Sequence, residues 1–229
     1  NPDIKTPNID ALAERGIRFE QFYVASPICS PSRVAVTTGQ FPARHRINSY
    51  LNSRARNTAR GMVNFLDPSV PAIARTFQEA GYATAHFGKW HMGGGRDVDD
   101  APLPQAYGFT ESLVSFEGLG DRILQANNHG LSAQSAKLGQ GTITYTENHK
   151  NTETYVNRSL DFIENNKNNS FYLHLWLNDV HDPFRPTQLQ LNKFKAYAGN
   201  KYLQQYYAVM DEMDRQLGRL FDGITSLNL

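Results

Sequence analysis

The run Phe-Tyr-Leu-His-Leu-Trp-Leu at residues 171–177 constrains the fold more than any other part of this sequence. It is almost continuously apolar, which is typical of a strand buried on both faces. Strands of this kind belong mainly to parallel sheets, because crossover helices cover both faces of such sheets. A helical pattern over about residues 152–165 precedes the run, so this region indicates an α/β unit.

The rest of the chain alternates in the same way. Thr6 as N-cap and Pro7 at the first helical position predict a helix that ends near Gly16. Further expected elements are a short strand at 17–23, a helix from the N-cap Ser30 to Gly39, a helix at 71–80, a strand at 82–87 and a long helix at about 201–221. We expect an α/β fold with a mostly parallel sheet and helices on both faces.

The length of 229 residues suits one large domain or two small ones, and we interpret residues 1–229 as a single domain. Polar segments at about 43–68 and 96–150 are predicted to be long excursions, which often carry specificity. The net charge of +1 gives no field that points to nucleic acid or to a membrane surface. No apolar run approaches the ~20 residues of a membrane span, and no signal peptide is present in these residues.

Polar clusters follow two of the expected strands directly. Lys89 and His91 come after the strand at 82–87, and His181 comes after the apolar run. Ligand sites in open α/β sheets lie at the carboxyl ends of strands, so these residues are expected to share a site. Taken singly, each has a plainer interpretation: Lys89 as a surface lysine, His181 as part of a turn, and residues 93–95 (Gly-Gly-Gly) as a flexible turn.

Cys29, the single cysteine, precedes a predicted helix, and Arg33 lies near the start of that helix. Unpaired N–H groups, the helix dipole and a guanidinium together favour an anion. The alternative is that Cys29 is a small buried apolar residue and Arg33 a surface charge. One cysteine excludes an intrachain disulfide.

The local strings favour the first interpretation. Cys-Ser-Pro-Ser-Arg at 29–33, followed by Thr38-Gly39, resembles the first signature of the type I sulfatases of the alkaline phosphatase superfamily. Gly-Tyr-Ala-Thr at 81–84 with Gly-Lys-Trp-His at 88–91 resembles the second signature. The strings at 6–10 and 181–184 are also similar, so the resemblance runs over most of the chain. Thr37 departs from the usual Leu or Met, at a position that we interpret as packing.

The resemblance implies an alkaline-phosphatase-like core and a covalent mechanism. A maturation enzyme would oxidise Cys29 to formylglycine, whose hydrate attacks the sulfur of a sulfate ester; its second hydroxyl then expels sulfate. By the same resemblance, Arg33 would hold the hydrate and Lys89 would bind sulfate and nucleophile. His91 would orient the hydrate or help its later collapse, and His181 would protonate the leaving alcohol. Asp179 and Arg185, which flank His181, are candidates for substrate contact.

The resemblance also implies one divalent cation, usually calcium, held by oxygen ligands. Of its ligands, only Cys29 in oxidised form is expected here; an Asp-Asp pair and an Asp-Asn pair would lie outside these residues, and Asp99-Asp100 stands in the wrong context to replace them. We therefore interpret the chain as a partial sulfatase catalytic domain. Alone, it is expected neither to bind calcium tightly nor to turn over sulfate esters.

Three functions remain open at this point. The first is hydrolysis of the sulfate ester of a small molecule or oligosaccharide, with a sulfated carbohydrate favoured because long polar segments suggest a wide polar site. The second is a phosphoryl or phosphonate ester hydrolase of the same superfamily, and the third is an inactive sulfatase-like binding domain. The expected partners are the ester and the maturation enzyme, without nucleic acid or a membrane span. The expected location is periplasmic, secreted or lysosomal.

Overall fold

The computed structural model describes residues 3–126 and 130–229, and the chain divides into two compact units. Unit 1 comprises residues 1–22, 147–167 and 177–229, and unit 2 comprises residues 23–146 and 168–176. The interpretation of residues 1–229 as a single catalytic domain stays a prediction.

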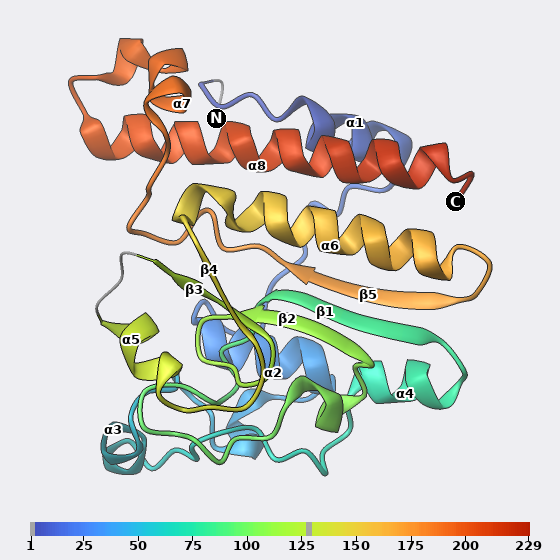
Figure 1. The fold of residues 1–229 in the computed structure, drawn as a ribbon, viewed down its shortest axis with the longest axis vertical. Coiled ribbons are helices and arrows are strands. Elements are labelled where there is room, and N and C mark those ends of the chain that lie inside the picture. Colours follow the sequence, from blue (N-terminus) through green and yellow to red (C-terminus); the bar gives the residue numbers. More distant parts are fainter. Residues whose placement is uncertain (1–2, 127–129) are drawn as a thin grey trace. The chain divides into compact units, whose positions relative to one another are not determined.

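Unit 2 is built on a five-stranded sheet (Figure 1). Its strands are β1 (Ala83–Lys89), β2 (Glu111–Ser115), β3 (Arg122–Gln125), β4 (Ile143–Thr146) and β5 (Phe171–Trp176). The order is β4-β3-β2-β1-β5, and each pair of neighbours is parallel. The predicted α/β class with a mostly parallel sheet is therefore confirmed.

Two expectations about this sheet are wrong. Residues 96–150 are not simply long excursions, because β2, β3 and β4 lie within them. The run at 171–177 forms β5, but its residues are only partly buried. The reason is its place in the sheet: β5 is the end strand of the described sheet and pairs on one side only, with β1.

The helices of unit 2 are short. They are α2 (Cys29–Thr38), η1 (Pro42–His45), α3 (Arg54–Ala59), α4 (Ile73–Glu79), η2 (Pro104–Tyr107) and α5 (Leu131–Ala136). The segment at 43–68, expected to be loop, thus contains α3 and most of η1. α4 packs on β1 and β5, and Trp90, Tyr107 and Phe109 are buried in the core beside it.

Unit 1 is helical, and its longest element is α8. Its elements are α1 (Pro7–Arg15), η3 (Asn148–Lys150), α6 (Asn151–Asn166), α7 (Gln188–Lys193), η4 (Lys195–Tyr197) and α8 (Lys201–Ser226). α8 packs against α1, α6 and α7. These bounds confirm the predicted helices at 7–16, 152–165 and 201–221 within a few residues.

The start of α1 is capped from α8. Asp214 is 2% exposed and accepts hydrogen bonds from the backbone N–H groups of Asn8 and Ile9, at 3.1 and 3.0 Å. A carboxylate at a helix N-terminus satisfies unpaired donors and complements the dipole. Thr6, the expected N-cap, makes no cap hydrogen bond with its side chain. Thr6 thus stands at the predicted N-cap position. The capping acceptor, however, is Asp214, which is 206 residues away from Asn8 along the chain.

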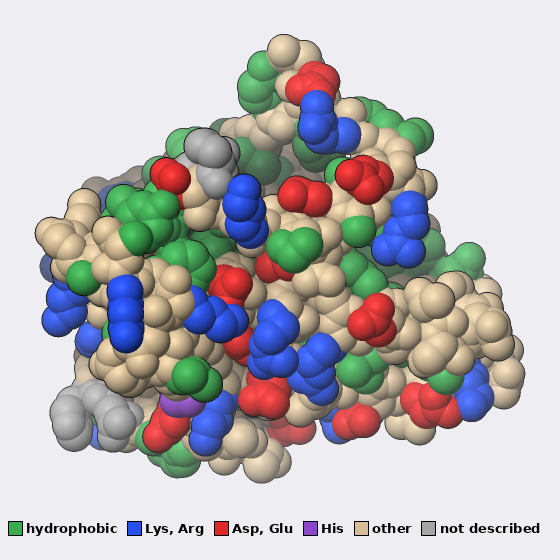
Figure 2. All heavy atoms as spheres, turned by 90° about the horizontal axis from the view of Figure 1, so that it is seen from above, with side chains coloured by type: hydrophobic (Ala, Val, Ile, Leu, Met, Phe, Trp, Pro, Cys, Tyr) green, Lys and Arg blue, Asp and Glu red, His purple; other side chains and the backbone are tan. Residues whose placement is uncertain are grey.

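The strand expected at 17–23 is absent. Residues 17, 19, 22 and 23 are among the most exposed large apolar side chains, and no strand is assigned there. An alternating pattern becomes a strand only when a neighbour completes its hydrogen bonds, and none of the described strands pairs with this segment. Among the described residues, no helix is long and apolar enough to cross a membrane. On the face shown in Figure 2, acidic and basic side chains are interspersed, in keeping with the net charge of +1.

Candidate functional site

Cys29 is the first residue of α2 in unit 2 and is partly buried. The residue that flanks the helix is Ile28, in an extended conformation, so Ser30 is not the N-cap that the sequence predicts. Pro31 can occupy the third helical position because the first four N–H groups of a helix need no intrahelical acceptor. The Oγ of Ser30 instead accepts a hydrogen bond from the backbone N–H of Leu51 at 3.0 Å. Cys29 is thus held in the first turn of a helix, where N–H groups are unpaired.

Arg33 lies one turn further along α2, on the same side as Cys29. Its guanidinium donates to the backbone carbonyl of Lys89 at 2.8 Å and lies 4.6 Å from the ring centre of Trp176. Burial lowers the pKa of Arg33 to about 10, although its interaction with Cys29 raises it. The side chain therefore stays cationic at neutral pH and is oriented by two partners.

Lys89 is the last residue of β1 and is 3% exposed. Its Nζ lies 4.5 Å from the ring centre of Phe116, an arrangement suited to a cation over an aromatic face. Burial lowers the pKa of Lys89 most, Arg33 lowers it further, and Cys29 and Glu117 raise it. Arg33 and Lys89 thus place two cationic side chains within electrostatic reach of Cys29, as expected for a site at strand ends.

His91 follows two residues beyond β1 and is 2% exposed. Its φ of +48° is uncommon for a residue with a side chain, and its Nε2 lies 3.1 Å from the carbonyl oxygen of Leu51. Burial, followed by the charge on Lys89, lowers the pKa of His91 to about 3. The ring is therefore neutral at physiological pH. We refer to Cys29, Arg33, Lys89 and His91 together as the Cys29 cluster.

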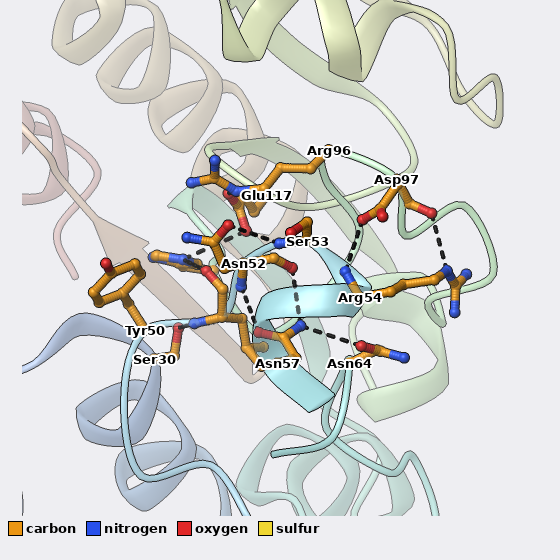
Figure 3. A network of polar contacts seen from close by, with 12 residues as sticks. Ser30, Tyr50, Asn52, Ser53, Arg54, Asn57, Asn64, Arg96, Asp97 and Glu117 are labelled. Carbon is orange, nitrogen blue, oxygen red and sulfur yellow. Dashed lines mark hydrogen bonds and ion pairs between the residues drawn. The ribbon is translucent and has the colours of Figure 1, made fainter. Parts of the chain in front are cut away.

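Two charged residues beside His91, Glu117 and Arg96, are not predicted by the sequence motifs. Glu117, 8% exposed, places Oε2 at 3.5 Å from His91 Nε2, and its Oε1 accepts from Arg96 Nε at 2.6 Å (Figure 3). Glu117 lies two residues beyond β2, so the rule of strand ends applies to it as well. The adjacent apolar residues Leu113 and Val114 are a weak local signal for this strand, because the residues around them are polar.

The glycines at 93–95 are not merely a flexible turn. A Cβ on Gly93 would lie 2.2 Å from Phe65 Cβ, and one on Gly95 would lie 2.6 Å from Glu117 Cγ. No side chain fits at either distance without displacement. These positions therefore need glycine because the segment that follows His91 packs closely on its neighbours.

The other predicted residues lie in unit 1. Asp179, His181 and Arg185 line a pocket together with Asn151 and Glu212, which we name the His181 pocket. His181 and Arg185 are exposed, and Nδ1 of His181 lies 2.7 Å from the carbonyl oxygen of Asp182. Asp179 accepts from the Thr152 hydroxyl at 2.5 Å, and burial raises the pKa of its carboxyl group.

Comparison with known proteins identifies the family. The family model described as Sulfatase matches residues 1–228. The chain belongs to the sulfatase family. N-acetylgalactosamine-6-sulfatase from Homo sapiens is 27% identical over 239 residues, which cover 100% of this chain and 43% of that protein. The sulfatase chain thus spans less than half the length of this relative, and about half the length of the solved structures it resembles.

Solved structures agree with this assignment. The crystal structure of Ps i-CgsB matches with a TM-score of 0.75 and 26% identity over 98% of this chain and 50% of that one. Its complex with k-i-k-neocarrahexaose matches with a TM-score of 0.76. A phosphonate monoester hydrolase of Agrobacterium radiobacter has a TM-score of 0.59 at 16% identity, a likeness of fold alone. The sulfatase chain therefore has an alkaline-phosphatase-like α/β fold.

The described residues do not form a complete site for the divalent cation implied for sulfatases. No group of three or more His, Cys, Asp or Glu side chains there could hold a metal ion. Asp99 and Asp100 are instead paired with Arg54, at 3.1 and 2.6 Å. The predictions that calcium binds and that Cys29 becomes both formylglycine and a metal ligand stay predictions.

Proposed function

We propose that this chain forms part of the active site of a sulfuric ester hydrolase whose nucleophile is made from Cys29. The observation that supports this most is the position of Cys29 in the first turn of α2, within electrostatic reach of Arg33 and Lys89. A helix N-terminus and two cations suit the tetrahedral anion of a sulfate group. The family assignment supports the same reaction.

The role proposed for each residue follows from its charge and its protonation state. Formylglycine at position 29 would supply a hydroxyl that attacks sulfur and a second hydroxyl whose collapse releases sulfate. Lys89 and Arg33 stabilise negative charge on the sulfate oxygens, and Arg33 also anchors the end of β1 through the Lys89 carbonyl. His91, being neutral, accepts a hydrogen bond or a proton. His181 is assigned proton delivery to the leaving alcohol.

The substrate class proposed is a sulfated carbohydrate. A relative that matches over the whole chain is named N-acetylgalactosamine-6-sulfatase, and a matching structure is described as a complex with k-i-k-neocarrahexaose. The His181 pocket supports this choice, because carboxylate, amide and guanidinium groups that line it are able to bind sugar hydroxyls. Arg185 is proposed as a substrate contact there. The predicted periplasmic, secreted or lysosomal location stays a prediction.

Mass spectrometry of the peptide that contains Cys29 tests the nucleophile. The protein is produced in a host that carries the formylglycine maturation system, and conversion replaces the thiol by an aldehyde and lowers the peptide mass. An unmodified thiol would contradict the proposed function and favour an inactive binding domain. Cys29→Ala is the matched control, since it cannot be converted.

The rates at which different esters are hydrolysed distinguish a sulfatase from a phosphoryl or phosphonate ester hydrolase. The longer protein that carries this chain, once matured, is expected to release sulfate from sulfated sugars much faster than phosphate or phosphonate from matched esters. Faster release from the phosphorus esters would instead assign the chain to the second function weighed from the sequence. The Cys29→Ala protein is expected to release neither.

A further inference from the structure

One backbone residue links the start of α2 to His91. The N–H of Leu51 donates to Ser30 Oγ at 3.0 Å, and the carbonyl oxygen of Leu51 lies 3.1 Å from His91 Nε2. A carbonyl oxygen can only accept a hydrogen bond, so Nε2 must carry the proton in this contact. In a neutral ring, Nδ1 then holds a lone pair, and it is buried with no hydrogen-bond partner in the described part of the chain.

The loop that presents Leu51 is itself held by buried amides. Asn57 is fully buried, and its side chain accepts from Asn52 N at 2.8 Å and donates to Asn52 O at 2.9 Å (Figure 3). It donates further to Asn64 Oδ1 at 3.2 Å. These contacts fix the peptide next to Leu51, so the acceptor that faces His91 does not depend on a freely moving loop.

Glu117 provides a second oxygen that faces the same nitrogen. Its Oε2 lies 3.5 Å from His91 Nε2, a distance at which the interaction is electrostatic rather than a short hydrogen bond. Arg96 fixes the other oxygen at 2.6 Å. A carboxylate behind a histidine orients the ring and stabilises a proton taken up on its far nitrogen. Glu117 therefore reaches the Cys29 cluster at the His91 ring, and it also interacts electrostatically with Lys89.

The backbone is shaped to bring Glu117 there. Phe116 and Glu117 both have positive φ values, +53° and +56°, which cost roughly 1–2 kcal/mol per residue for side chains of this kind. Gly95 allows Glu117 to pack against it, because a Cβ would approach Glu117 Cα to 3.0 Å. Burial raises the pKa of Glu117 to about 7, whereas Arg96 and Lys89 lower it. A strained and buried carboxyl group of this kind is typical of functional sites.

We propose that Glu117, held by Arg96, is a positioning residue that acts with the Leu51 carbonyl to fix His91 as the Nε2-protonated tautomer, leaving Nδ1 as the acceptor for a hydroxyl. The inference rests on the proposed function for its purpose, because the acceptor is needed by a hydroxyl nucleophile at position 29. The tautomer itself can be measured without any turnover.

Nitrogen NMR of the chain labelled with ¹⁵N-histidine tests the inference, since long-range couplings to ring protons distinguish the two tautomers. His91→Gln identifies the His91 signals by their loss. The native chain is expected to show a pyrrole-type Nε2 and a pyridine-type Nδ1. Glu117→Ala is expected to shift both nitrogens toward averaged values, because the Leu51 carbonyl alone then holds the ring.

Three further variants sharpen the result. Glu117→Asp keeps the carboxylate and is expected to restore most of the native pattern. In Glu117→Gln, Arg96 takes the amide oxygen and the NH₂ group faces Nε2, so the Nε2-protonated form is expected to decrease even if the Ala variant fails to fold. Asp99→Asn removes an exposed charge that pairs with Arg54 and is expected to leave the His91 signals unchanged.

A native His91 that is protonated on Nδ1, or on both nitrogens, would overturn the inference. So would a native pattern that survives in both Glu117→Ala and Glu117→Gln. Failure of the proposed function is a separate result: an unconverted Cys29 would remove the nucleophile and leave the tautomer measurement valid.

Discussion

The Cys29 cluster of unit 2 and the His181 pocket of unit 1 are built in opposite ways. In the cluster, Lys89 and His91 are 3% and 2% exposed, and each contacts a defined partner. In the pocket, His181 and Arg185 are exposed on the segment between β5 and α7. Phe184 anchors that segment, packing against the rings of Tyr202 and Tyr206 at 5.1 and 5.4 Å.

The difference matches the roles proposed for the two regions. A charged group that stabilises a transition state works best when it is fixed before substrate arrives, and burial at strand ends fixes it. Groups that contact the variable part of a substrate are commonly on loops carried by a rigid scaffold. The cluster is therefore expected to stabilise the charge of the transition state. In the pocket, Arg185 is expected to affect which substrates bind, while His181 keeps its proposed role of delivering a proton to the leaving alcohol.

The largest effect is expected when one cationic side chain from each region is replaced by alanine in the matured, longer protein. Lys89→Ala is expected to lower kcat by about 10²–10³-fold, as for the loss of one preformed transition-state contact. Arg185→Ala is expected to raise KM by less than about 10-fold with kcat nearly unchanged. Steady-state kinetics on a sulfated sugar checks both. A larger kcat loss for Arg185→Ala would reverse the assignment of the two regions.

Acid stability provides the next largest effect, through His174 on β5. Burial, then Arg33, lowers the pKa of His174 to about 4 from its ordinary 6.5. Between these values the unfolded chain binds more protons than the folded chain, so stability falls as pH decreases from 6.5 toward 4. The loss is on the order of 3 kcal/mol and levels off below pH 4.

His174→Gln removes this titration. Urea unfolding midpoints, measured from pH 7.5 down to pH 4, are expected to decline less steeply in His174→Gln than in the native chain. Each protein is compared with its own value at pH 7.5, so that any constant cost of the substitution cancels. Parallel declines in the two proteins would contradict the assignment of the acid sensitivity to His174.

A matched pair of histidine variants compares rigidity directly. His91→Gln is expected to destabilise unit 2 by about 1–3 kcal/mol, because the buried Leu51 carbonyl and Glu117 lose a fitted partner. His181→Gln is expected to change stability by less than about 0.5 kcal/mol, since the side chain is exposed. Urea or thermal unfolding of the chain measures both. Equal costs would show that the pocket is as rigidly built as the cluster.

The smallest effect is expected at Asp179. Burial raises the pKa of its carboxyl group, and an amide can still accept the hydrogen bond from the Thr152 hydroxyl. Asp179→Asn is therefore expected to cost less than about 1 kcal/mol, while Asp179→Ala, which leaves Thr152 without this acceptor, is expected to cost about 1–3 kcal/mol. Thermal unfolding of both variants checks the order, and a larger cost for Asn would mean that the charge on Asp179 is needed.

The site residues that could be predicted from the sequence are those that belong to short local motifs. Cys29, Arg33 and Lys89 follow from two local patterns and from the rule that sites lie at strand ends, and the structure brings them together. Glu117 and Arg96 could not be predicted in the same way. Their role depends on the register of β2 beside β1, which pairs Ser115 with Lys89, and on tight backbone turns that local composition does not specify.

Local sequence pattern also failed to predict burial where contacts with distant parts of the chain determine it. The apolar residues of α8 recur at helical spacing and predict an apolar inner face that consists of Tyr206, Val209, Met210, Met213, Leu217 and Leu220. Asp214 is more deeply buried than most of these residues because it caps a helix from the other end of the chain. The sequence of a long amphipathic helix does not distinguish a buried carboxylate that caps another helix from a carboxylate that is exposed to solvent.

That cap has a consequence for the order of assembly on the ribosome. Synthesis proceeds from the N-terminus, so α1 leaves the ribosome about two hundred residues before Asp214 and has no carboxylate to dock on. Residues 23–146, which supply most of unit 2, are complete well before α8 exists. α1 must therefore wait unanchored until Asp214 has been synthesised. Any message that ends before the codon for Asp214 encodes a chain in which α1 is never secured by this cap.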